Sequence, residues 1–180
     1  MKHVPLPVFR QITMNSDQRC FVLGQVFSMS MMATAQRGRL YAEGVSERVR
    51  LELRSTLRER LEGLLPKYLQ PVSESEHAAV IGDLANFISS TRGYALQGGR
   101  LRIGSSQKVL NLYLKYMWCF GEIAMPPHCP FDSLVLARIP SCTHVRWTRL
   151  DSIDEYQRIV REAKIEAGTV SLAEWELRLY

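Results

Sequence analysis

The segment from residue 109 to residue 120 constrains the fold more than any other part of the chain, because it reads as a helix that is apolar nearly all round. Large side chains recur along one side at offsets of three and four residues, and a second side is apolar as well (Val109, Leu112, Tyr113, Tyr116, Met117 and Phe120; Leu110, Leu114 and Trp118). Such a helix is the buried centre of a domain. The rest of the chain must therefore supply the elements that surround it.

The flanking sequence mostly predicts further helices. Helical spacing of apolar residues and Ser-x-x-Glu capping boxes indicate five more of them: from Ser16 or Asp17 to Gly38, over 45–69, over 73–93, over 152–168, and a short one after Ser171. The Gly- and Arg-rich stretch 93–102 is expected to be a loop or a short β-hairpin, and the run 134–139 is ambiguous between strand and helix. We expect a mainly α fold, one helical domain over residues 1–180 with an irregular segment at 1–16.

Composition and charge set the class of protein and of partner. With 180 residues, 46% of them hydrophobic and 23% charged, the chain has the makeup of one ordinary globular domain. A formal net charge of +5 and a pI of about 9.2 favour a polyanionic partner. No apolar run approaches the roughly 18 residues of a membrane span, and the start MKHVPLPVFR lacks the apolar core of a signal peptide. We expect no membrane contact and a cytoplasmic location.

Several cysteine and histidine side chains raise the question of a metal site (Cys119, His128, Cys129, Cys142 and His144). No CxxC pair is present, and the spacing matches no common zinc signature. We therefore expect neither a metal nor another cofactor, and free thiols in a reducing compartment.

A narrow polar line interrupts the apolar helix at Lys108, Asn111 and Lys115, again at offsets of three and four. Because an unpaired buried ammonium is costly, this line must face solvent, a cleft or a ligand. Lys108 follows the small-residue turn 104–107, and both the helix dipole and partial burial disfavour its charged form there. An uncharged lysine is a usable nucleophile for Schiff-base chemistry, and the amides of the same turn are suited to a phosphate. The alternative is an ordinary exposed lysine in the first helical turn.

Two short motifs carry a family resemblance. The run Gly104-Ser105-Ser106-Gln107-Lys108-Val109, followed downstream by Pro130-Phe131-Asp132, resembles the signature of helix-hairpin-helix DNA glycosylases of the 8-oxoguanine type. The resemblance places Gly104 on the first hairpin glycine, Lys108 on the nucleophile and Asp132 on the aspartate that assists it, with Ser106 in place of the second glycine. It implies a bifunctional N-glycosylase and AP lyase, a hydrolase and lyase of DNA repair, that excises a modified or oxidised base through a lysine Schiff base.

The resemblance also implies a set of DNA contacts. Duplex DNA with a modified base is the expected partner, and residues around the turn are candidates for phosphate contacts (Gly104, Ser105, Ser106, Gln107, Arg100, Arg102 and Lys115). Enzymes of this kind flip the base into an aromatic pocket, for which the chain offers five candidates (Trp118, Phe120, His128, Phe131 and Trp147). The alternative function is a non-catalytic helical module that binds nucleic acid or a protein, in which most of these aromatics belong to the core.

Overall fold

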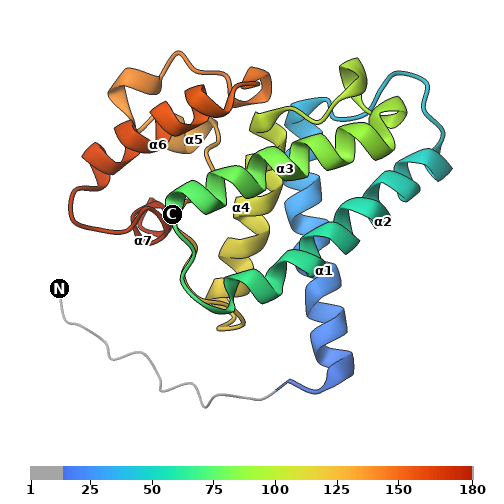
Figure 1. Ribbon diagram of the computed structural model, residues 1–180, viewed down its shortest axis with the longest axis horizontal. Helices are drawn as coiled ribbons and strands as arrows, with labels where there is room; N and C mark the ends of the chain where they lie inside the picture. Colours follow the sequence, from blue (N-terminus) through green and yellow to red (C-terminus); the bar gives the residue numbers. More distant parts are fainter. Residues whose placement is uncertain (1–13, 180) are drawn as a thin grey trace.

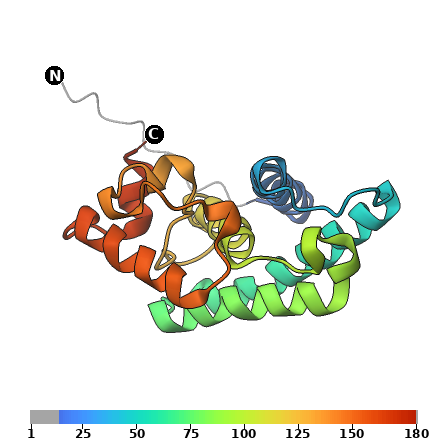
Figure 2. The ribbon, with the colours of Figure 1, turned by 90° about the horizontal axis from the view of Figure 1, so that it is seen from above.

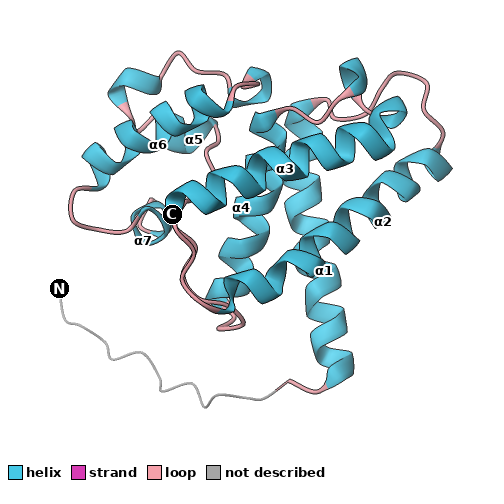
Figure 3. Cartoon of the chain, viewed as in Figure 1, coloured by secondary structure: helices cyan, strands magenta, loops and turns pink. Residues whose placement is uncertain are grey.

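The computed structural model describes residues 14–179, and over this range the protein is built from helices (Figures 1 and 3). The α-helices are α1 (Ser16–Gly38), α2 (Glu47–Leu64), α3 (Glu74–Arg92), α4 (Ile103–Cys119), α5 (Ser133–Leu136), α6 (Ile153–Ala167) and α7 (Leu172–Leu177). Short 3-10 turns lie between them: η1 (Leu65–Leu69), η2 (Gly93–Ala95), η3 (Gln97–Gly99), η4 (Pro140–Cys142) and η5 (Trp147–Arg149). Residues 14–179 contain no β-strand, so the predicted mainly α fold is confirmed.

The predicted central helix is α4. Every residue from Gly104 to Leu114 is buried, and α1 and α3 both pack against the helix. Figure 2 shows α4 between these two helices, with α6 beside it. The burial does not extend to the end of the apolar segment, because Phe120, just past the last turn, is 51% exposed.

Capping side chains set several helix boundaries. The predicted capping box at Ser73 and Glu76 is present, and Ser152 and Ser171 each accept a hydrogen bond from the amide three residues on. The first helix is capped by Asn15 rather than by Ser16 or Asp17, which lie inside it. The other residues of the predicted irregular N-terminal segment, 1–13, lie outside the described range.

The predicted helix 45–69 ends as an α-helix at Leu64 and continues as the 3-10 turn η1, which has Pro66 near its start. Proline lacks an amide hydrogen and cannot continue the α-helical hydrogen-bond ladder. The apolar stripe of α2 faces the core through Leu53, Leu57 and Leu61. Its opposite face carries charged pairs one turn apart, such as Arg58 and Glu62 at 2.7 Å.

Two ambiguous segments are now assigned. The stretch that begins at Gly93 forms the turns η2 and η3 instead of a β-hairpin. Backbone hydrogen bonds at Ala95 and Gln97 connect it to residues 40–42, and an isolated bridge joins Tyr41 and Leu96. The run 134–139 forms the short helix α5 and the turn after it. None of the helices within residues 14–179 is long and apolar enough to cross a membrane.

Candidate active site

The start of α4 is held against the turn η5 at a single glycine. The amide of Gly104 donates to the carbonyl of Leu150 at 2.8 Å, and a Cβ atom at this position would lie 1.7 Å from the carbonyl oxygen of Trp147. A glycine is therefore required where the two backbones meet. Gly104, Ser105 and Ser106 are all buried, and Oγ of Ser106 donates to the carbonyl of Ile81 in α3 at 2.7 Å. Their amides were expected to bind phosphate, but those of Gly104 and Ser106 donate to the carbonyls of Leu150 and Arg102.

Lys108 lies in the second turn of α4, and only 6% of its surface is exposed. Its Nζ donates a hydrogen bond to Oδ2 of Asp132 at 2.7 Å. The alternative of an ordinary exposed lysine is thus excluded. The amine and the carboxylate singled out from the sequence, 24 residues apart, form one buried ion pair.

Asp132 is fixed by the backbone as well as by Lys108. It is the N-cap of α5, where its Oδ1 accepts hydrogen bonds from the amides of Leu134 at 2.9 Å and Val135 at 3.1 Å. Burial raises the pKa of Asp132, but the hydrogen bond and charge of Lys108 and the two amides outweigh burial and lower this pKa below its usual value of 3.8. The residue therefore presents a carboxylate, with one oxygen held by the backbone and the other directed at the amine.

Gln107 positions the loop that carries Asp132. Its Nε2 donates to the carbonyl of Phe131 at 2.8 Å, and its Oε1 accepts from the amide of Phe131 at 3.1 Å. The two bonds fix the residue immediately before the aspartate. Gln107 was expected to contact DNA, but it is fully buried and supports the site from within.

A buried polar network supports the same loop from the next turn of α4. Nδ2 of Asn111 donates to the carbonyl of Cys129 at 2.9 Å, and Oδ1 lies 2.7 Å from Nε2 of His77. Tyr68 contacts the other ring nitrogen of His77 at 2.7 Å, and Tyr156 lies 3.3 Å from Nδ2 of Asn111. Burial lowers the pKa of His77 to about 4, although the bond to Asn111 raises it, so the ring is neutral at pH 7.

Sequence reasoning missed this network, but one signal for it exists. His77 lies three and four residues before Val80 and Ile81, on the apolar face of α3. A polar residue on an apolar helical face requires a buried partner, which here is Asn111.

Two cavities meet at Lys108. The first, of about 270 Å³, is lined by residues of α1 and η5 together with the ion pair (Met32, Ala33, Gln36, Arg37, Lys108, Asp132, Leu134 and Trp147). The second, of about 340 Å³, runs along α4 towards α7 (Lys108, Leu112, Lys115, Tyr116, Pro130 and Glu176). The contributions of Gln36 and Arg37 were not foreseen, because only the packing of α1 on α4 brings them to the site.

A second ion pair lies in the second cavity. Nζ of Lys115 lies 2.6 Å from Oε2 of Glu176, and it donates to Oε1 at 2.9 Å. Burial raises the pKa of Glu176, and the hydrogen bond and charge of Lys115 only partly offset this effect. Lys115 was expected to contact DNA, but its ammonium is directed at an internal carboxylate.

The predicted aromatic pocket is only partly assembled. Trp147 lines the first cavity beside Lys108. Phe131 is fully buried in the core. Trp118 is partly buried and packs against the core, and Phe120 is exposed beyond the end of α4. None of these three lines either cavity at Lys108. His128 lines a different cavity, between α3 and α6.

The two arginines expected at phosphates lie before α4. Arg100 forms an exposed ion pair with Asp151, and Arg102 is the N-cap residue of the helix. Neither lines the cavities at Lys108.

Within residues 14–179, histidine, cysteine and acidic side chains do not gather in a group of three that could hold a metal ion. Cys119 is exposed near the end of α4, whereas Cys129 and Cys142 are buried. Comparisons with protein-family models, with curated proteins and with solved structures found no match. The candidate function therefore has to be argued from the geometry around Lys108.

Proposed function

We propose that this protein is a DNA N-glycosylase with AP-lyase activity that excises a modified or oxidised base from duplex DNA. The observation that supports the proposal is the contact between Nζ of Lys108 and Oδ2 of Asp132 at 2.7 Å, with both residues on the wall of one cavity. A Schiff-base glycosylase needs an amine and a carboxylate at one site. The motif resemblance assigns these roles to the same two residues.

In the proposed reaction, Lys108 first loses a proton to water, because only the free amine is nucleophilic. Nζ then bonds to the sugar C1′, while the bond from C1′ to the base breaks and the base leaves with the electron pair and takes up a proton. Transfer of a proton from Nζ to the ring oxygen opens the sugar and gives the Schiff base. Loss of a C2′ proton then expels the 3′ phosphate, and water releases Lys108.

The lowered pKa of Asp132 defines its part in this scheme. Its carboxylate form stabilises the positive charge that develops at C1′ as the base departs. The amides of Leu134 and Val135 hold the other oxygen, so the group stays in place when substrate displaces the ammonium. Fixed charge of this kind costs little reorganisation during the reaction.

The first cavity suits the extruded base. Its volume of about 270 Å³ is just below the range of about 300 to 1,000 Å³ typical for drug-sized ligands, which are larger than a nucleobase. Trp147 offers an aromatic surface, and Gln36 offers amide groups for the edge of a flipped base. Arg37, at the end of α1, supplies a cation for a neighbouring phosphate.

Borohydride trapping tests the proposal. The protein is incubated with duplexes that carry a panel of modified bases, and reduction converts the Schiff base into a stable adduct. We expect an adduct with the wild type and loss of at least about a thousandfold in Lys108→Gln, because the nucleophile is removed. Lys115→Gln is the matched control, since it alters a paired lysine of the same helix, and it should keep the adduct.

Two outcomes would contradict the proposal. One is full strand cleavage by Lys108→Gln. The other is the absence of any adduct or cleavage across the panel while the wild type still binds DNA in a salt-dependent way. The second outcome would identify the non-catalytic binding module instead.

A further inference from the structure

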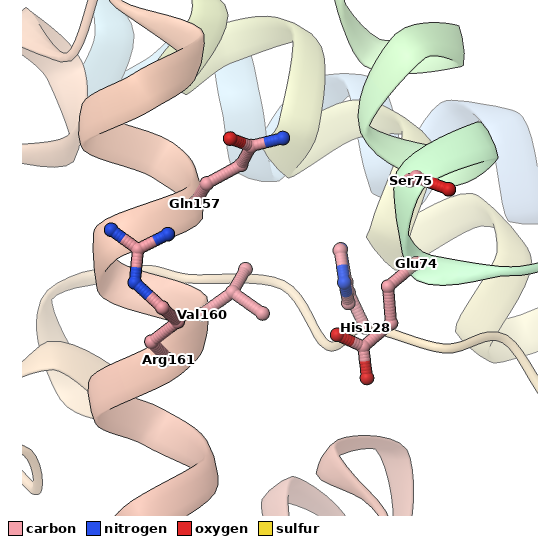
Figure 4. A pocket seen from close by; sticks show the side chains of 6 residues that line it. All are labelled: Glu74, Ser75, His128, Gln157, Val160 and Arg161. Carbon is pink, nitrogen blue, oxygen red and sulfur yellow. The ribbon is translucent and has the colours of Figure 1, made fainter.

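A third cavity, of about 590 Å³, lies away from Lys108, between the first turn of α3 and the middle of α6 (Figure 4). It is lined by Glu74, Ser75, His128, Gln157, Val160 and Arg161, none of which lines the two cavities at Lys108. Its volume lies within the range of about 300 to 1,000 Å³ found for small-molecule sites.

The His128 ring stands between the two helices and is 2% exposed. Its Nδ1 lies 2.8 Å from the hydroxyl of Tyr156. Among the described residues, its Nε2 is buried and has no hydrogen-bond partner. A buried polar atom without a partner costs about 1 to 3 kcal/mol, and an acceptor that reached this atom from the cavity would recover part of that cost.

The hydrogen-bond network fixes which nitrogen of His128 carries the proton. Nδ2 of Asn111 donates to the carbonyl of Cys129 at 2.9 Å and lies 3.3 Å from both Oε1 of Gln107 and the Tyr156 hydroxyl. Because this nitrogen cannot accept a hydrogen bond, the Tyr156 hydroxyl must direct its own hydrogen elsewhere. Its remaining partner is Nδ1 of His128. Burial, together with the charges of His77 and Lys164, lowers the pKa of His128 to about 2. The ring is thus neutral, and Nε2 carries the hydrogen and offers it as a donor.

The charge balance of this cavity favours an anion. Glu74 is the acidic group on its wall, and Lys164 neutralises it through a contact of 2.6 Å between Nζ and Oε1. Arg161, on the α6 wall, forms no ion pair or hydrogen bond within residues 14–179. One positive charge therefore remains, and it is a guanidinium, whose planar fork matches phosphate oxygens.

We propose that this cavity binds a small phosphate monoester of the nucleoside monophosphate class. Arg161 donates to two phosphate oxygens, and Nε2–H of His128 supplies a neutral donor to an acceptor of the ligand. The amide of Gln157 adds a further donor from α6. The remaining volume receives the nucleoside. This site depends on none of the residues of the Lys108 chemistry.

Calorimetric titration of the full chain tests this site, with inorganic phosphate, deoxyadenosine monophosphate and deoxyadenosine as probes. We expect saturable binding of the monophosphate and at least about tenfold weaker binding of deoxyadenosine, because the charge-assisted bonds to Arg161 are lost. Arg161→Gln should weaken the monophosphate at least about tenfold. Arg158→Gln, on the same helix but outside the cavity, is the control and should bind as the wild type does.

Nitrogen NMR of the histidine side chains gives a second readout. The Nε2 resonance of His128 should shift when the monophosphate binds, and an equal concentration of deoxyadenosine should shift it less. Lys108→Gln should bind the monophosphate normally, which separates this proposal from the glycosylase. The proposal is overturned if the monophosphate does not bind, if Arg161→Gln binds it unchanged, or if the His128 resonance does not move.

The phosphate has two possible sources, a free nucleotide or the end of a DNA strand. A short duplex with a 5′ phosphate is therefore compared with the same duplex without it, in competition against the monophosphate. If only the duplex with the 5′ phosphate competes, the site binds strand ends. If neither duplex competes, the site binds free nucleotides. Competition by both duplexes alike would show that phosphate monoesters are not what the cavity recognises.

Discussion

Two lysines on one face of α4 each meet a carboxylate, yet the two ion pairs have different properties. Lys108 contacts Asp132 and, about two turns further on, Lys115 contacts Glu176. The pKa of Asp132 is lowered, whereas burial raises the pKa of Glu176. Two lysines of one helix therefore contact one carboxyl group whose pKa favours the charged form and one whose pKa favours the neutral form.

The difference arises from burial and from the backbone: Glu176 is the more buried of the two, and within residues 14–179 only Asp132 has backbone donors. Asp132 caps α5, and two amides bind its Oδ1 in addition to Lys108. Glu176 lies within α7 and is 2% exposed, and the ammonium of Lys115 donates to its Oε1 at 2.9 Å. A partner charge alone does not offset the desolvation free energy of a buried carboxylate, whereas a partner charge together with backbone donors does. Only the first arrangement suits a group whose charge has to persist during a reaction.

The largest effect is expected at Gly104. Gly104→Val would drive a side chain into the carbonyl of Trp147, which lies 1.7 Å from the position of a Cβ atom. We expect a loss of about 4 kcal/mol or more in the free energy of unfolding, or failure to fold, measured by urea denaturation. Gly82→Val, with nothing within 4 Å of its Cβ position, is the control. A loss of under about 1 kcal/mol at Gly104 would contradict the close contact.

The next test breaks the Lys115 pair. Lys115→Met leaves Glu176 buried without its ammonium, so we expect a loss of about 3 kcal/mol at pH 7. The double variant Lys115→Met/Glu176→Gln removes both charges and should recover most of this loss. Lys108→Met should cost less than Lys115→Met, since Asp132 retains its two amide bonds. The reverse order would mean that the amides do not account for the difference between the pairs.

A smaller effect separates the two functions of Asp132. Asp132→Asn keeps an oxygen for the α5 amides, whereas Asp132→Ala removes the cap as well as the charge. We expect the alanine variant to be less stable than the asparagine variant by about 1 kcal/mol, as measured by urea denaturation. Both variants should lose the borohydride adduct. Equal stability of the two would show that capping contributes little at this position.

The smallest effect is a pH dependence of opposite sign at the two carboxylates. The pKa of Asp132 is lowered, so its stabilisation is present above its usual value of 3.8 and is lost as pH falls through the folded value. The pKa of Glu176 is raised above 4.5, so folding is favoured below that value and stability declines as pH rises through the folded value.

Urea unfolding between pH 3 and pH 7 measures this contrast. The stability advantage of the wild type over Asp132→Asn should shrink at the acidic end of that range. The wild type should gain stability relative to Glu176→Gln as pH falls, because Glu176 takes up its proton more readily in the folded state. Parallel profiles for the two variants would remove the electrostatic distinction between the pairs.

Much of the fold could be predicted because its signals are local. Helical spacing of apolar residues located α2, α3, α4 and α6, and the capping box at Ser73 marked the start of α3. The break at Pro66 also follows from local stereochemistry. The Gly- and Arg-rich stretch 93–102 carries no local signal that predicts its turns, because η2 and η3 depend on backbone hydrogen bonds to residues 40–42.

The candidate site was predictable only in part. Lys108 and Asp132 were identified from motif order, and the structure brings them together. The base-pocket candidates fared less well, since aromatic residue type does not distinguish Trp147 at the cavity from Phe131 in the core. Gln107 was assigned to DNA because its turn was expected to be exposed, whereas that turn is buried in the structure.

The sequence by itself determined that a helix apolar nearly all round forms the centre of a mainly α protein, because side-chain periodicity decides which residues leave water. It also determined that the polar line at Lys108, Asn111 and Lys115 needs partners. Only the tertiary structure decided which partners these are, since they come from α3, from the loop before α5 and from α7, far away in the chain. Burial and backbone donors then gave the two carboxylates opposite pKa shifts, and neither is a property of residue type.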